Sequence, residues 1–266
     1  MDRKQGVVTA FVKKLDTKQG RVQVEYRSID DKLESTWAPI ASPMSGKGRG
    51  ALFMPEKGDE VLVAFHDGKF DSPYVVGFLW NGEQVSPEEK PENRVIVTPG
   101  GHQLRFEDKK GDRRVVLKSD GGHTITLEDK DPKKIEIKST QNVVTLDDTN
   151  GAANISIKAG QAGTVSITLN TVPPSVKVSN GTASVEFGPS GITVMSPGTV
   201  TIQSAGVATV NCTAATVNAA GMTTINGAML SVNAGLTTFA GAVICTSLIA
   251  NAVVSPVYSP GIGNLL

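Results

Sequence analysis

Few side chains in this chain are of the types that commonly act as catalysts or metal ligands. There are three histidines, His66, His102 and His123, and two cysteines, Cys212 and Cys245. A zinc site needs such residues at close, paired spacings, and these show none. His102 and His123 follow a glycine at equivalent places of a repeat, so we expect stacked strand residues there and buried thiols at the cysteines. The sequence predicts no catalytic, cofactor-binding or metal-binding residue, and no cofactor.

One glycine-rich stretch, Gly46-Lys47-Gly48-Arg49-Gly50, has the composition of an anion-binding loop. It lacks the Gly-Lys-Ser/Thr ending of a phosphate loop. We therefore expect a flexible loop and assign it no ligand.

Charge is distributed unevenly along the chain. The 26 basic and 26 acidic residues all lie before Phe187, and the first 85 residues hold 12 of each sign. This balance gives no sign of a polyanionic partner such as nucleic acid. The uncharged remainder is interrupted by Thr, Ser, Asn and Gly too often to form a transmembrane helix.

The uncharged segment contains a short repeat in which a hydroxyl residue precedes an apolar one. The pairs recur in steps of 7 or 8 at Thr201-Ile202, Thr209-Val210, Thr216-Val217, Thr224-Ile225, Ser231-Val232 and Thr238-Phe239. Each step leaves room for one or two inward apolar side chains beside a turn, which is too little for one chain to enclose a core. We predict that three parallel chains complete each layer as a closed, uncharged prism.

A longer repeat precedes the uncharged segment. Leu117, Ile137 and Ile157 are spaced by 20 residues in similar apolar-polar strands. Further alternating strands precede each of them at 101–108, 122–129 and 141–148, each ending in acidic residues at a turn. This repeat predicts a shaft that is broader than the uncharged segment and has one face exposed to water.

The first 85 residues predict a small closed β-domain. Alternating strands at 20–26 and 58–65 each follow a turn glycine, and a closing strand lies within 73–82. The predicted fold class is therefore all-β, an N-terminal barrel followed by a trimeric, intertwined β-helix or β-prism. The predicted domains are 1–85 (barrel), 86–98 (linker), 99–163 (upper shaft), 164–254 (narrow uncharged needle) and 255–266 (C-terminal tip segment).

Several motifs give the chain a specific resemblance over residues 6–160. They are Gly-Arg-Val-x-Val at 20–24, Trp37, Gly46, Gly50, Pro55-x-x-Gly58-Asp59-Glu60-Val61-x-Val63-x-Phe65, Asp71-x-Pro73-x-Val75-x-Gly77 and the repeated Gly-His-x-Leu/Ile-x-Phe/Leu-Glu-Asp. The barrel resembles the OB-fold of VgrG and of phage baseplate assembly protein V, and the Gly-His strands resemble the VgrG region that follows it.

The resemblance implies a trimeric central spike of a contractile phage tail or a related injection system. It would sit below a separate tail hub protein at the OB-fold end and puncture the target cell envelope when the sheath contracts. Some family members carry a lysozyme domain after the OB-fold, but no such insertion lies between Gly82 and Val95. We therefore expect a structural protein without enzymatic activity.

Partners and location follow as expectations. The N-terminal residues are polar and lack a signal core, so we expect synthesis in the cytoplasm and assembly into a virion tail or injection-system baseplate. The tip segment would expose Val257, Tyr258 and Ile262, which suggests docking of a PAAR-like tip protein, with a fold-back cap or a frayed terminus as alternatives. The target membrane would be a transient contact.

Two other functions remain as alternatives. A single-chain β-helix that binds or cleaves glycans would need exposed charged residues in its repeat, and the uncharged segment has none. An OB-fold that binds nucleic acid would need basic and aromatic residues on its sheet, whereas this domain is neutral.

Overall fold

The computed structural model describes residues 6–30, 33–160 and 163–254. The chain forms two units, Met1–Ile202 and Gln203–Leu266. The regular secondary structure of the first unit is almost all β-strand, as the sequence predicts, and includes an N-terminal barrel and one large sheet. No helix in the described part of the chain is long and apolar enough to cross a membrane.

The barrel is a five-stranded antiparallel sheet in the order β3-β2-β1-β6-β7. Its strands are β1 (Val7–Asp16), β2 (Arg21–Glu25), β3 (Ala38–Pro39), β6 (Glu60–Phe65) and β7 (Pro73–Phe78). A bridge between Ile40 and Val75 joins the two edges, and the Ala41 N–H donates to the Val75 carbonyl at 2.8 Å. The sheet thus closes on itself, which is how small β-domains remove their edges.

The barrel encloses the buried core of the molecule. Alternate residues of β1, β2, β6 and β7 point inward, and all of the core residues are at most 2% exposed: Ala10, Val12, Val22, Val24, Tyr26, Ala38, Val61, Val63 and Val75. Tyr26 packs against Phe70, with ring centroids 4.9 Å apart. Burial raises the pKa of the Tyr26 hydroxyl to about 12, and the nearby Ser35 side chain acts in the opposite direction.

The motif around Gly58 forms the turn that leads into β6. Gly58 has a φ of +96°, a conformation that glycine adopts without strain. Its N–H donates to the Val12 carbonyl at 2.8 Å, and the Val12 N–H donates to the Asp59 carbonyl at 2.9 Å. The Asp59 carboxylate accepts the Glu56 N–H at 2.8 Å. The residues that carry the sequence resemblance therefore fix one corner of the barrel.

The glycine-rich stretch forms a tight hairpin of two short strands, β4 (Ser45–Gly46) and β5 (Arg49–Gly50). A side chain at Gly50 would meet the Met44 carbonyl oxygen at 2.9 Å. The hairpin therefore needs glycine for close approach of its backbone, where the sequence predicted a flexible loop.

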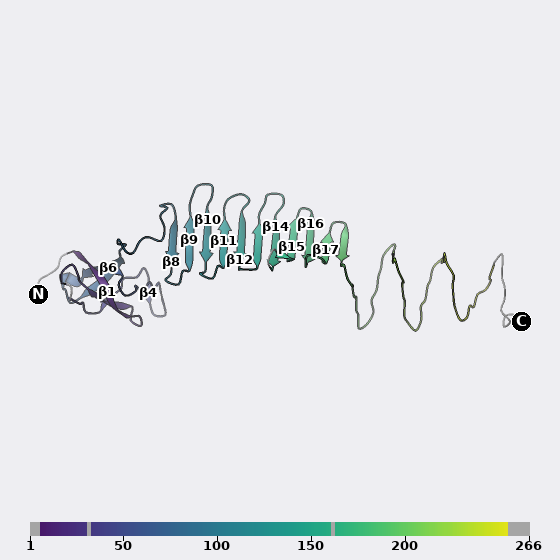
Figure 1. Cartoon of the computed structure of the whole chain (residues 1–266), viewed down its shortest axis with the longest axis horizontal. Coiled ribbons are helices and arrows are strands. Elements are labelled where there is room, and N and C mark those ends of the chain that lie inside the picture. The colour runs from purple at the N-terminus through teal and green to yellow at the C-terminus, as the bar shows by residue number, and fades with distance from the viewer. Residues whose placement is uncertain (1–5, 31–32, 161–162, 255–266) are drawn as a thin grey trace. The chain divides into compact units, whose positions relative to one another are not determined.

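The large sheet has eleven antiparallel strands that follow one another in chain order, as Figure 1 shows. Its strands are β8 (Arg94–Val97), β9 (Gln103–Glu107), β10 (Arg114–Lys118), β11 (Thr124–Glu128), β12 (Lys134–Lys138), β13 (Val143–Asp147), β14 (Asn154–Ala159), β15 (Val165–Thr171), β16 (Pro174–Ser179), β17 (Ser184–Gly188) and β18 (Gly191–Met195). β8 begins inside the range expected to be a linker, and the same sheet continues beyond residue 164, where a narrower segment was expected.

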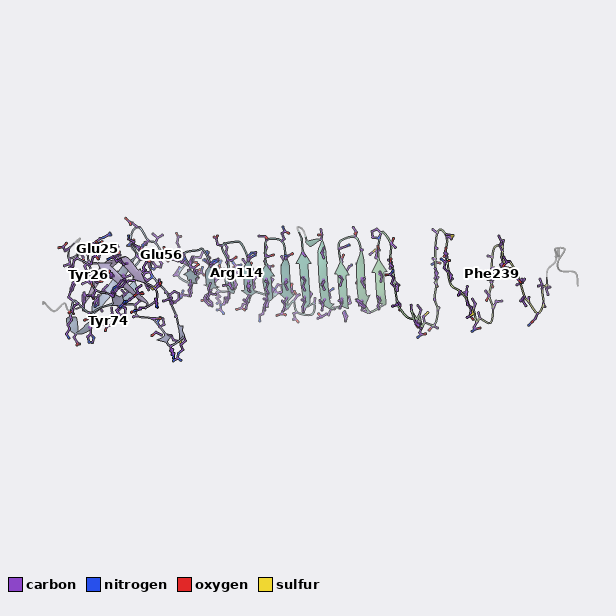
Figure 2. All side chains as sticks on the ribbon, turned by 90° about the horizontal axis from the view of Figure 1, so that it is seen from below. Glu25, Tyr26, Glu56, Tyr74, Arg114 and Phe239 are labelled. Atoms are coloured by element: carbon purple, nitrogen blue, oxygen red, sulfur yellow. The ribbon has the colours of Figure 1, made fainter. Side chains whose placement is uncertain are left out.

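The second unit differs from the first. Its described residues, 203–254, form neither helix nor strand and are exposed, including Phe239 at 69% (Figure 2). Cys212 and Cys245 are free and exposed, so the expectation of buried thiols is wrong for the single chain. The short repeat of hydroxyl and apolar residues therefore gains no regular pairing within this chain.

Candidate functional site

The large sheet carries two continuous columns of apolar side chains on one face. They arise because the second and fourth residues of the five-residue strands are apolar and the registers align them. One column is Ile96, Leu104, Leu117, Ile125, Ile137, Val144, Ile157, Ile167, Val178, Val185 and Val194. The other is Phe106, Val115, Leu127, Ile135, Leu146, Ile155, Leu169, Val176, Phe187 and Ile192.

This surface, called the apolar face below, has no cover in the described chain. Leu117 is 50% exposed, Ile137 46% and Ile157 43%, although all three lie in central strands. Soluble monomers rarely expose a contiguous apolar patch of this extent, and larger patches mark interaction surfaces. The apolar face is therefore the strongest candidate for a functional surface in the sheet.

The opposite face of the sheet, called the polar face, carries the residues that alternate with the two apolar columns, which are the first, third and fifth residues of the five-residue strands. Its central column includes Thr126, Glu136, Thr145, Ser156 and Thr168. These residues are partly buried or, for Ser156 at 8% exposure, buried, because flanking side chains cover them. The alternation assigns one face to solvent and leaves the other to be covered.

A chain of ion pairs fastens the segment after the barrel to the start of the large sheet. Arg105 pairs with Glu88 and donates from Nε to Glu107 at 2.9 Å, and Arg114 donates from Nε to the other oxygen of Glu107. Glu88 also accepts the Asn93 side-chain amide at 2.9 Å. Figure 2 places Arg114 in this first part of the sheet. Residues expected to be a linker are thus tied to β9.

These contacts favour the charged form of both carboxyl groups. The pKa of Glu107 is lowered chiefly by the hydrogen bond from Arg114, with burial acting against it. The pKa of Glu88 is lowered first by the Lys90 backbone N–H and then by Asn93. Neither pKa is raised, as the pKa of a general acid would be. We therefore interpret the cluster as a structural contact, called the clamp below.

Hollows in the structure are open and mostly apolar. One of about 740 Å³ lies beside the β4–β5 hairpin, where Met44, Leu52 and Phe53 line it. Two others open on the apolar face, one of about 350 Å³ that includes Leu117, Ile125 and Ile137, and one of about 670 Å³ that includes Ile155 and Phe187. The last two are depressions in the unpaired face of the sheet.

The structure places the predicted histidines at separate positions. His66 lies in a short 3₁₀ turn, η1 (His66–Gly68), at the end of β6. His102 and His123 directly precede β9 and β11, which fits the expectation of equivalent repeat positions. Among the described residues no group of three His, Cys, Asp or Glu could hold a metal ion. Val257, Tyr258 and Ile262, expected at the tip, lie outside the described residues.

The signal for the apolar face was present in the sequence as the 20-residue spacing of Leu117, Ile137 and Ile157. The ion-pair cluster was missed, because its partners come from the linker, β9 and β10 and meet only once the strands are paired. In the sequence Glu88 is one of several acidic residues of a polar linker, so nothing marks it as a contact of Arg105.

Comparison with known proteins extends the picture of the barrel. Residues 4–80 match the family described as the type VI secretion system/phage-baseplate injector OB domain. The type VI secretion system spike protein VgrG5 of Pseudomonas aeruginosa is 38% identical over 112 residues, which is 37% of this chain and 14% of that protein. VgrG1a of the same species is 30% identical over 113 residues and 18% of its length, and VgrG3 of Vibrio cholerae is 28% identical over 110 residues and 11% of its length.

The matched region thus spans less than a fifth of the length of these curated relatives. The likeness covers the OB domain and supports the resemblance seen in its motifs.

Proposed function

We propose that this chain, which belongs through its OB domain to the VgrG and phage baseplate assembly protein V family, is a structural subunit of the central spike of a contractile injection system. The observation that carries the proposal is the apolar face: one column of apolar residues crosses all eleven strands and the other crosses ten, and most of these side chains are exposed, in the sheet that follows an injector OB domain. Such a face requires partners along its whole length.

The partners that fit best are two further copies of the chain. Each strand contributes two apolar residues to one level of the sheet, so three sheets facing inward would enclose a narrow triangular core. The polar faces would then be outside and solvated. The second unit supports the same arrangement, because its exposed apolar residues recur every 7 or 8 positions without pairing within one chain.

Sedimentation of the intact protein tests this proposal directly. We expect a trimer at about micromolar concentration, because each apolar face removed from water contributes about 25 cal/mol per Å² of buried surface. Unfolding must separate three chains, so the trimer should resist detergent and melt with a scan-rate-dependent midpoint. A folded monomer at that concentration would contradict the proposal.

We assign the penetration of the target membrane to the uncharged C-terminal segment. Residues 187–266 hold no charged side chain, and each ammonium group taken into hydrocarbon costs about 3 kcal/mol on insertion scales. Thr209→Lys or Thr224→Lys would add three such groups to one level of a trimer. We expect assembled particles with either substitution to lose killing or infection efficiency, whereas Thr209→Ser should not. Normal efficiency of the lysine variants would mean that charge avoidance is not why this segment is neutral.

The remaining parts of the proposal place the spike in its assembly. A separate hub protein would bind at the OB-domain end, and the assembled protein would belong to a virion tail or injection-system baseplate made in the producing cell. The action would be mechanical rather than enzymatic, in keeping with relatives named as spike proteins. Electron microscopy of particles carrying a labelled chain would test the position, and absence of the label from the spike would refute it.

The C-terminal segment completes the proposal as the dock for a PAAR-like tip protein. Val257, Tyr258 and Ile262 are the residues expected to contact it. Deleting residues 255–266 should leave the trimer intact but abolish co-purification of the tip protein. Unchanged tip binding after the deletion would exclude this segment as the dock.

A further inference from the structure

Alternate strands of the large sheet have a side chain that can donate a hydrogen bond at one end and a carboxylate that can accept one at the other. Immediately before β9, β11 and β13 stand three residues that can donate a side-chain N–H, called the donor end: His102, His123 and Asn142. Immediately after the same strands stand three carboxylates, called the acid end: Asp108, Asp129 and Asp148. Donor and acid on one strand are six residues apart, about 20 Å in an extended chain, so they do not meet within one copy.

Both ends lie on the side of the sheet that carries the apolar face. Side chains alternate along a strand, so the residues two before the first apolar position and two after the second share its face. For the donor end this agrees with the position of His123, which lines the 350 Å³ hollow together with Leu117, Ile125 and Ile137. The donor and acid ends therefore border the apolar face on its two long sides.

At the donor end, one ring nitrogen of His102 is already hydrogen-bonded within the chain. The Nδ1 atom of His102 accepts a hydrogen bond from the Asp120 backbone N–H at 3.2 Å. In the neutral imidazole the proton is then on Nε2, which becomes a donor. Gly101 has a φ of +79°, and a side chain there would meet the Asp120 carboxylate at 2.8 Å, so glycine lets this turn close beside the histidine.

The acid end presents carboxylates whose own backbone is already satisfied. The Asp129 N–H donates to the Arg113 carbonyl at 3.0 Å, and the Asp148 N–H donates to the Lys133 carbonyl at 2.8 Å. The cations on the neighbouring strand ends, Arg113 and Lys133, lie beside these acids in the ladder, yet the described residues show no ion pair to Asp108, Asp129 or Asp148. The three carboxylates are exposed.

Threefold symmetry brings the two ends together. A rotation without translation keeps the same strand of every copy at the same level, so at each corner of a three-sided prism the acid end of one sheet meets the donor end of the next. We infer that Asp108, Asp129 and Asp148 of each copy accept hydrogen bonds from His102, His123 and Asn142 of the neighbouring copy, level by level. This inference rests on the proposed trimer and adds the contacts that fix its register.

The strands in between support the same register. At their ends Arg113 and Lys133 would face the hydroxyl groups of Ser119 and Ser139 on the next copy, which can accept from a cation. If neighbouring copies were shifted by one strand, Arg113 would face a histidine and the three aspartates would face serines. The charge-assisted hydrogen bonds of the aspartates would then be replaced by weaker contacts. At β14 the residues at the equivalent positions are both alanine, Ala153 and Ala159, so the corner contacts at that level would be apolar.

Disulfide trapping tests the register. In a background with Cys212→Ser and Cys245→Ser, the double substitution His123→Cys with Asp129→Cys should oxidise to a covalent trimer, because a disulfide forms only when the two Cα atoms lie within about 7 Å. The matched control, His102→Cys with Asp129→Cys, places the second thiol two strands away, about 10 Å along the sheet, and should stay uncrosslinked. Sedimentation before oxidation establishes the oligomeric state of each variant.

The outcomes separate this inference from the trimer itself. A trimer that crosslinks in the matched pair and not in the control supports the corner contacts. A trimer that fails to crosslink in the matched pair, or crosslinks in the control, overturns them and leaves the proposed spike standing. A monomer overturns both.

A second measurement avoids cysteine altogether. His123→Gln and Asp129→Asn should each speed subunit exchange about fivefold, and the double variant should be no faster than the worse single one, because both remove the same contact. Multiplying effects in the double variant would show that the two residues do not interact.

Discussion

The barrel and the large sheet are both built from strands that alternate apolar and polar residues, but the barrel buries its apolar side chains and the sheet leaves many of them exposed. Val63 and Val75 in the barrel are fully buried, while Ile137 and Ile157 in the sheet are nearly half exposed. The barrel closes because β3 returns to β7, so its inward residues meet one another. The large sheet runs strand after strand without returning. One region buries its apolar side chains within a single chain, and the other leaves an apolar surface that the proposed trimer would cover.

The largest expected effect comes from a charge on the apolar face. Ile137→Lys would bury three ammonium groups at one level of the proposed trimer, and an unpaired buried charge costs several kcal/mol. We expect sedimentation to show the trimer replaced by monomer or aggregate. The control is Glu136→Lys, the next residue on the polar face, which should leave the trimer intact. Loss of the trimer in both variants, or in neither, would remove the distinction between the faces.

A core substitution in the barrel should act differently. Val63→Ala deletes buried methyl groups and should lower the free energy of unfolding of the OB domain by about 2 kcal/mol, without changing the oligomeric state. Denaturant titration followed through the barrel's aromatic residues would measure it. Val76→Ala, at a position 46% exposed on β7, should cost less than about 0.5 kcal/mol. Equal costs at the two positions would contradict the assignment of the core.

How far the sequence predicts this structure differs between the two regions. The barrel strands and the turn at Gly58 follow from alternation and glycine placement, which are local signals. The strands around Leu117 and Ile137 follow from their 20-residue spacing. β8 was missed because acidic residues and prolines around it are typical of a linker, and the contact that holds the segment, Glu88 with Arg105, depends on tertiary pairing. The tip contacts stay a prediction.

Stability should fall in acid because the ion pairs of Glu107 and Glu88 at the start of the large sheet are lost. A carboxylate whose pKa is lowered by folding stabilises the native state above its ordinary pKa of 4.5, and that contribution is lost as pH falls through the lowered value. Glu107→Gln should therefore cost about 1 kcal/mol at pH 7, where the hydrogen bonds from Arg105 and Arg114 are charge-assisted. The cost should shrink below about pH 4.5. A variant with unchanged stability at pH 7 would show that the clamp contributes little.

The smallest expected effect belongs to an ion pair of the same kind in a more exposed place. Lys177 on β16 and Glu186 on β17 approach to 3.3 Å, but their side chains are 43% and 42% exposed, against 21% for Glu107. Water screens an exposed pair, so Lys177→Met, which keeps the aliphatic stem, should change stability by less than about 0.5 kcal/mol. Any effect should vanish in about 1 M salt, where charges are screened within about 3 Å. Thermal melts of the two variants at low and high salt would compare the pairs. If Lys177→Met lowered the free energy of unfolding as much as Glu107→Gln, solvent exposure could not explain the strength of either ion pair. The ion pairs of the polar face would then contribute to holding the strands of the sheet together.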